Sequence, residues 1–155
     1  MKRIIIIGGY GNGTVVASTI EDINASSASL QWEILGFLND RETEPINGYP
    51  VLGKVDHDSV QKYLSQDDIF FMYSLISAKL NYMFLYKLHN LKIPTERFAT
   101  IVHPTAVISK FAKIGHGVCI QPFVSVGPNV VIENHVQIFA QSLIGHNSVI
   151  KNYSY

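Results

Sequence analysis

The segment that decides the fold runs from residue 102 to residue 155: VHPTAVISKFAKIGHGVCIQPFVSVGPNVVIENHVQIFAQSLIGHNSVIKNYSY. A Val or Ile recurs at every sixth position of this segment, without a break in frame. These residues are Val102, Ile108, Ile114, Ile120, Val126, Ile132, Ile138, Ile144 and Ile150. A run of this length at one fixed period indicates a repeat architecture rather than an ordinary series of amphipathic strands.

A second set of residues follows the same period, four positions after each member of the first set. Its members are small or β-branched: Ala106, Ala112, Val118, Val124, Val130, Val136, Ser142, Ser148 and Ser154. A strand of about four residues plus a two-residue corner makes one flat side, and three such sides close a triangular coil. We expect the first set to point inward and stack one coil apart, and the second set to lie where the chain bends. The pattern predicts three coils of a parallel β-helix.

Before the repeat, apolar strands alternate with helical segments. Residues 24–31 are expected to form a polar loop and residues 47–53 a turn-rich return. This alternation is typical of a parallel sheet with crossover helices. We therefore expect an α/β domain over residues 1–100 and the β-helix over residues 101–155. The predicted strands are 3–7, 33–40 and 68–74, and the predicted helices are 14–23, 58–64 and 77–91.

A glycine-rich turn, GGYGNG at residues 8–13, joins the first predicted strand to the first helix. This order places backbone N–H groups and a helix N-terminus where an anion binds. Asp40 ends the next strand, at a place suited to gripping a ribose hydroxyl. The third glycine of the dinucleotide motif is replaced by Thr14, which argues against a nicotinamide cofactor. Glycines that serve only strand–helix packing are the alternative interpretation.

The composition argues against several classes of function. The formal net charge is zero, and no basic stripe indicates a nucleic-acid partner. No apolar run approaches the length of a membrane span. The single cysteine, Cys119, excludes an internal disulfide, and the histidines lack metal-ligand spacing, so no metal is expected. A cytoplasmic protein fits these features, and the low charged fraction of 15% favours a surface covered by partners.

Five segments of the chain together resemble the hexapeptide-repeat sugar acyltransferases, which include sialic acid O-acetyltransferases and UDP-4-amino-sugar N-acetyltransferases. They span nearly the whole chain: IIIIGGYGNG (4–13), GFLND (36–40), GYPVLG (48–53), IVHPTAVIS (101–109) and SLIGHNSVI (142–150). The resemblance implies a Rossmann-like α/β domain, a left-handed β-helix and a homotrimer formed through the β-helix. It also implies acetyl-CoA as co-substrate and a nucleotide-linked amino sugar or sialic acid as acceptor, of which we favour the nucleotide-linked sugar.

The same resemblance assigns site residues. A histidine at a coil corner is the family's general base, and His146 falls on that position. A neutral imidazole suits this role, since the attacking amine or hydroxyl must lose a proton. Asn147 stands where the family often has an acidic residue, so it can orient His146 but not stabilise an imidazolium by charge. The residues implied to hold the sugar nucleotide are Gly8, Gly11, Asn12 and Asp40.

Two further expectations concern the β-helix. His116 lies at the same point of its repeat as His146, and its equivalents in the next two coils are Asn134 and Asn152, so a polar corner ladder is predicted. The family's later coils, which carry much of the CoA site, have no counterpart before Tyr155, so we expect a shortened β-helix that binds acetyl-CoA poorly. This shortening and Asn147 favour the alternative function, a non-catalytic module that binds a sugar nucleotide and trimerises.

Overall fold

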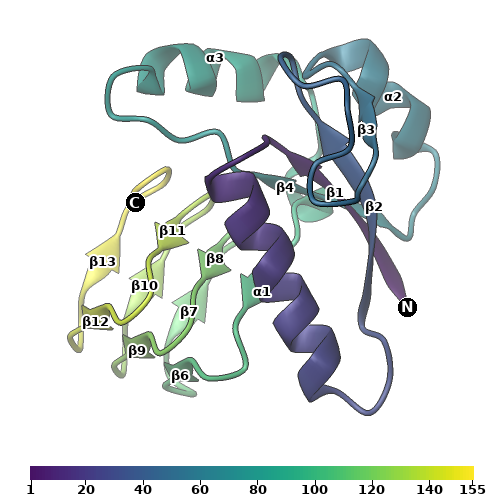
Figure 1. Cartoon of the computed structure of the whole chain (residues 1–155). Helices are drawn as coiled ribbons and strands as arrows, with labels where there is room; N and C mark the ends of the chain where they lie inside the picture. The colour runs from purple at the N-terminus through teal and green to yellow at the C-terminus, as the bar shows by residue number, and fades with distance from the viewer.

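The computed structural model describes residues 1–155 and contains an α/β part followed by a stack of short strands (Figure 1). The α/β part is built on a four-stranded parallel sheet in the order β3-β2-β1-β4. Residues 4–7 of the central strand are fully buried, as a parallel strand covered on both faces requires. The elements are β1 (Lys2–Ile7), α1 (Asn12–Ser26), β2 (Trp32–Leu38), β3 (Val51–Gly53), α2 (His57–Leu64), β4 (Ile69–Tyr73), α3 (Asn81–Asn90) and η1 (Thr95–Arg97).

Strand β3 was not expected, because its segment is rich in turn residues. It pairs in parallel with the end of β2. The carbonyl of Pro50 accepts from the N–H of Phe37, and the carbonyl of Gly53 accepts from the N–H of Asn39, both at 2.9 Å. Proline and glycine are tolerated here because β3 is an edge strand with one unpaired side.

Two helices also differ from their expected bounds. Helix α1 begins at Asn12 rather than Thr14 and continues to Ser26 through residues expected in a loop. The hydroxyls of Ser26 and Ser27 donate to the carbonyl of Ile23 at 2.9 and 2.8 Å, which closes the last turn. Helix α3 begins at Asn81 rather than residue 77, because the preceding residues form a separate turn.

The second part is a parallel β-helix of nine two-residue strands. The strands form three sheets, in the orders β11-β8-β5, β12-β9-β6 and β13-β10-β7. Val102 pairs with Ile120, and Ile120 with Ile138, so one coil is 18 residues as expected, although each strand is shorter than predicted. The strands are β5 (Ile101–Val102), β6 (Val107–Ile108), β7 (Lys113–Ile114), β8 (Cys119–Ile120), β9 (Ser125–Val126), β10 (Val131–Ile132), β11 (Gln137–Ile138), β12 (Leu143–Ile144) and β13 (Val149–Ile150).

Both periodic sets contribute to the core of the β-helix. The prediction that the second set lies at the bends was wrong, because its residues stand two positions before the next key Val or Ile and share its inward side. From Ile114 onward, the bends fall instead three positions after each key residue, where the backbone is left-handed: Gly117, Phe123, Asn129, His135, Gln141, Asn147 and Tyr153, with φ between 58° and 68°. The buried core residues are Val118, Ile120, Val124, Val126, Val130, Ile132, Val136 and Ile138.

The predicted polar ladder is confirmed. The backbone N–H of His116 donates to Asn134 Oδ1, and the N–H of Asn134 donates to Asn152 Oδ1, each at 2.8 Å. The rungs are 18 residues apart, so the amide side chain of each coil caps the corner of the coil before it. His116 takes part through its backbone, which leaves its exposed ring free.

The two parts share a hydrophobic core. Ile101 and Cys119 are fully buried in one cluster with residues of β1, β2 and α1. Burial raises the pKa of the Cys119 thiol to about 12, so the thiol stays protonated and is a packing residue. Gln137, the next outward residue on this side of the β-helix, donates from Nε2 to the carbonyl of Tyr73 at 3.3 Å.

Histidines make two further contacts across the junction. His103 Nε2 lies 3.1 Å from Asp22 Oδ2 of helix α1. The ring of His135 stacks on Tyr153, with centroids 5.5 Å apart, and meets the ring of Phe98 edge-on at 4.5 Å. Desolvation lowers the pKa of His135 to about 4, and its Nδ1 is buried without a hydrogen-bond partner.

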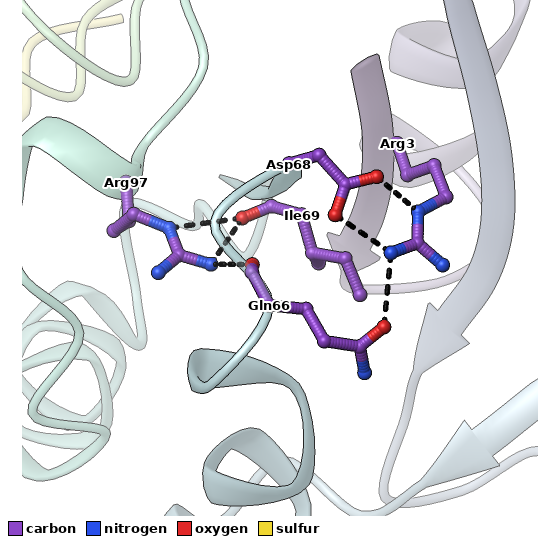
Figure 2. Close-up of polar contacts among 5 residues, drawn as sticks. All are labelled: Arg3, Gln66, Asp68, Ile69 and Arg97. Carbon is purple, nitrogen blue, oxygen red and sulfur yellow. Dashed lines mark hydrogen bonds and ion pairs between the residues drawn. The ribbon is translucent and has the colours of Figure 1, made fainter. Parts of the chain in front are cut away.

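A pair of arginines fixes the segment that leads into the β-helix (Figure 2). Arg97 of η1 donates to the carbonyls of Ile69 and Gln66. Arg3 of β1 holds the Asp68 carboxylate at 2.6 and 2.7 Å and the Gln66 side chain at 2.9 Å. The same turn before β4 therefore serves both the sheet and the connection to the β-helix.

Candidate functional site

A cavity of about 510 Å³ lies at the carboxyl ends of the strands of the α/β part. This edge of a parallel sheet is where ligands of open α/β folds bind. Its walls come from the glycine turn, the segment after β2, the segment after β4 and helix α3. Its polar lining includes Asn12, Asn39, Asp40, Ser74 and Lys87.

The first two glycines of the turn are required by close packing. A Cβ on Gly8, whose φ is 151°, would overlap Ser74 Oγ, and a Cβ on Gly9 would overlap Asn39 Nδ2. Ser74 Oγ donates to the carbonyl of Ile7, and Asn39 Nδ2 donates to the carbonyl of Gly8, both at 2.9 Å. Gly8 therefore allows the turn to pack closely but does not line the cavity, so it is not placed to contact a ligand as predicted.

The N-terminus of α1 is open toward the cavity. Gly11 is its N-cap, with φ 86° and ψ −120°, and makes no side-chain cap, and the first turn has no acidic residue. Its first N–H groups therefore lack the side-chain acceptor that usually satisfies them. Asn12 and Gly13 line the cavity, so these donors and the positive end of the helix favour an anion there.

Asp40 is held by two partners rather than free. Its Oδ1 accepts from the N–H of Val55 at 2.9 Å, and its Oδ2 pairs with Lys87 Nζ of α3. A ligand hydroxyl that bonds to Asp40 must therefore share the carboxylate with Lys87. Sequence reasoning missed Lys87, Asn39 and Ser74, since only the folded chain brings residues from three separate segments to the glycine turn.

His146 lies at the exposed corner between β12 and β13. Its Nδ1 is 2.9 Å from Asn147 Nδ2, and Asn147 Oδ1 accepts from Asn129 Nδ2 at 3.1 Å. A Cβ on Gly127 would lie 2.9 Å from the backbone nitrogen of His146, so this glycine allows the corner to stack closely.

The structure brings the predicted residues together in two groups. Asn12 and Asp40 line one cavity, and His146 adjoins Asn147 on the β-helix. His146 does not line the cavity. The corner between β12 and β13 lies away from α3, which forms one wall of the cavity (Figure 1). One chain therefore does not join the proposed base to the proposed nucleotide site.

Comparison with known proteins begins with the α/β part, where residues 3–74 match the family described as the PglD N-terminal domain. A curated relative, the acyl-[acyl-carrier-protein]–UDP-N-acetylglucosamine O-acyltransferase of Bartonella quintana (strain Toulouse), is 39% identical over 57 aligned positions. That alignment covers 33% of this chain and 21% of the relative.

Solved structures extend the likeness from residues 3–74 through the β-helix. The acetyltransferase domain of PglB from Neisseria gonorrhoeae FA1090 gives a TM-score of 0.77 at 22% identity, covering 99% of this chain and 69% of that one. PerB from Caulobacter crescentus, in complex with CoA and GDP-perosamine, gives 0.72 at 18%, covering 94% and 64%. WeeI from Acinetobacter baumannii AYE gives 0.69 at 20%, covering 97% and 66%. At these identities the likeness shows the fold alone. Together with the family match over residues 3–74 and the curated acyltransferase relative, it confirms the resemblance to hexapeptide-repeat sugar acyltransferases.

The structure contains neither a metal-binding cluster nor a membrane-spanning helix. No group of three or more His, Cys, Asp or Glu side chains is placed to hold a metal ion. No helix has both the length and the apolar character needed to cross a membrane.

Proposed function

We propose that this chain is an acetyltransferase that moves an acetyl group from acetyl-CoA to the amino group of a nucleotide-linked sugar. The observation that carries the proposal is the open cavity at the glycine turn, in the residues that match the PglD N-terminal domain, joined to a β-helix with a corner histidine. Two related structures support the choice of substrates, since PglB is seen with acetyl coenzyme A and PerB with CoA and GDP-perosamine. Sialic acid is the second acceptor to test.

In the proposed reaction His146 is the general base. The sugar amine attacks the thioester carbonyl, a C–N bond forms, the C–S bond breaks and CoA leaves as its thiol. His146 accepts the proton that the amine loses, a role that typically contributes 10²- to 10⁴-fold in rate. In the nucleotide site, the N-terminus of α1 faces the diphosphate, and Asn12 and Asp40 bond to the nucleoside. Gly8 and Gly11 keep the turn in shape.

The separation of cavity and histidine supports a homotrimer in which neighbouring left-handed β-helices complete the site. The corner that carries His146 is flanked by exposed apolar side chains, Leu143 of β12 and Val149 of β13, with exposures of 77% and 51%. Side chains this apolar and exposed are typical of a surface that a partner covers. We also propose a domain boundary near residue 100 and a cytoplasmic location, where both substrates are available.

The test is thiol release from acetyl-CoA in the presence of UDP- and GDP-linked 4-amino sugars and of sialic acid. His146→Ala is expected to lower kcat by 10²- to 10⁴-fold with the fold intact. His116→Ala is the matched control, because this exposed histidine occupies the same point of its repeat and keeps its ladder through the backbone. Equal loss in both variants, or turnover that survives His146→Ala, contradicts the assignment of the base.

A second candidate is a non-catalytic module that trimerises and holds a sugar nucleotide. Asn147 favours it, because an amide beside His146 supplies no charge to stabilise an imidazolium. Saturable binding of a nucleotide sugar, without thiol release for any acceptor of the panel, would favour this function over catalysis.

A further inference from the structure

A chain of two amides leads to the His146 ring. Asn129 and Asn147 stand 18 residues apart at the same corner of successive coils, and Asn129 Nδ2 donates to Asn147 Oδ1 at 3.1 Å. Asn147 Nδ2 is then the atom that faces His146 Nδ1, at 2.9 Å. No other polar side chain is bonded to His146.

The direction of this chain determines which ring nitrogen carries the proton. A primary amide has one oxygen that accepts and one nitrogen that donates, and a neutral imidazole has one N–H and one bare nitrogen. Because Asn147 uses its oxygen for Asn129, it presents its N–H to His146. The Nδ1 atom that receives this bond must be bare, so the neutral ring carries its proton on Nε2. With that proton in place, Nε2 donates a hydrogen bond and accepts none.

We propose that Asn129 is a positioning residue, which acts through Asn147 to hold His146 as the Nε2–H tautomer in the resting protein. In the reversed arrangement, Asn147 Oδ1 accepts from Nδ1–H and Asn147 Nδ2 donates to Asn129 Oδ1, which leaves Nε2 bare. The two amides must turn over together, since turning one alone sets two donors or two acceptors face to face. As a statement about catalysis this rests on the proposed function: Asn147 occupies Nδ1, so Nε2 is the nitrogen left to accept the proton of the sugar amine, and it must be bare to do so.

The backbone conformation of both corners allows Asn129 to be replaced without disturbing the fold. Asn129 and Asn147 have φ of 60° and 59°, and the N–H of Asn147 donates to the carbonyl of Pro128 at 3.0 Å. Asp and Gly adopt this left-handed conformation at little cost. Gly117 already occupies the equivalent corner of another ladder with φ 68°.

The experiment is nitrogen-15 NMR of the full, unliganded protein at pH 8, where an ordinary histidine is neutral. His146→Ala identifies the ring signals. We expect the N–H on Nε2 in the unchanged chain. Asn129→Asp can only accept, so it turns Asn147 over and moves the proton to Nδ1. Asn129→Gly removes the bias and gives a mixture. A proton on Nδ1 in the unchanged chain, or the same tautomer in the unchanged chain and Asn129→Asp, overturns the proposal.

Turnover provides a separate readout. In serine proteases, an amide in place of the carboxylate that orients the histidine gives the wrong tautomer and lowers kcat about 10⁴-fold. Asn129→Asp acts one residue further away, so we expect kcat to rise about tenfold with KM unchanged, and Asn129→Gly to fall between. If the NMR result holds and no thiol is released, the inference about Asn129 stands and the proposed function fails. If the protein is active but Asn129→Asp and Asn129→Gly leave kcat equal, the catalytic part of the proposal is wrong.

Discussion

The β-helix and the α/β part are held together over different distances along the chain. Polar side-chain contacts at the β-helix corners join residues 18 apart, as between Asn134 and Asn152. Those at the glycine turn span 31 residues from Asn39 to Gly8 and 67 from Ser74 to Ile7. A substitution in the β-helix therefore disturbs contacts with residues one coil away. A substitution at the glycine turn disturbs contacts with segments that are distant in the sequence of the α/β part.

The largest expected effect tests whether this difference divides the molecule into independent units. Ile120 is fully buried in the β-helix core, and Ile120→Ala is expected to cost about 2–5 kcal/mol of unfolding free energy. The neighbouring Cys119 packs into the cluster shared with β1 and β2. We therefore expect both parts to unfold in one transition. Circular dichroism and the fluorescence of the only tryptophan, Trp32 of β2, are the two probes that monitor it.

The matched control is Val107→Ala, at an outward position with 70% exposure, which is expected to change stability by less than about 0.5 kcal/mol. Different unfolding midpoints for the two probes in Ile120→Ala would show that the β-helix unfolds independently. That result would contradict a core shared by the two parts.

A smaller effect is expected from His135, where the two parts meet. Its folded pKa is about 4, against an ordinary 6.5, because of desolvation. Between these values the unfolded chain binds the extra proton and the folded chain does not, so stability falls as the pH drops from about 6.5 to 4. The loss is on the order of 2–3 kcal/mol.

Urea unfolding at pH 7 and pH 4.5 measures this loss. His135→Asn is the matched variant, because asparagine accepts the left-handed backbone of this corner but does not titrate. It should be less stable at pH 7, where the stack on Tyr153 is lost, but should lose less on acidification. An equal pH dependence in both proteins would assign the acid sensitivity to other groups.

Effects of similar size are expected from the glycines of the turn. Gly8→Ala meets Ser74 Oγ and also has a strained φ, so it is expected to cost about 2–4 kcal/mol. Gly11→Ala has open space around it and only the backbone strain, about 1–2 kcal/mol. Thermal unfolding of Gly8→Ala, Gly11→Ala, Ser74→Ala and the double change Gly8→Ala with Ser74→Ala separates the two causes, because Ser74→Ala alone measures the loss of the bond to the Ile7 carbonyl. If the costs of the two single changes simply add in the double change, contact with Ser74 is not what requires Gly8.

These contrasts explain what the sequence could predict. The β-helix followed from a local period, because each coil repeats the same packing problem and Ile120 meets the same kind of neighbour as Ile138. The α/β order followed from alternating apolar strands, but β3 was missed because its pairing with β2 is what stabilises it. The partners of the site are equally non-local: nothing near Asp40 in the sequence indicates Lys87, which comes from α3.

The smallest expected effect on stability is at this ion pair. The side chains of Lys87 and Asp40 are 35% and 39% exposed, so Lys87→Met is expected to change the unfolding free energy by less than about 1 kcal/mol. The proposed diphosphate, however, loses a cation that lines its cavity, so we expect UDP affinity to fall about 5- to 10-fold, with a weaker dependence on salt. Calorimetric titration measures both, with Lys62→Met, an exposed change on α2 outside the cavity, as control. Tighter UDP binding in Lys87→Met would instead mean that Lys87 competes with the nucleotide for Asp40. The lysine would then hinder nucleotide binding instead of contributing to it.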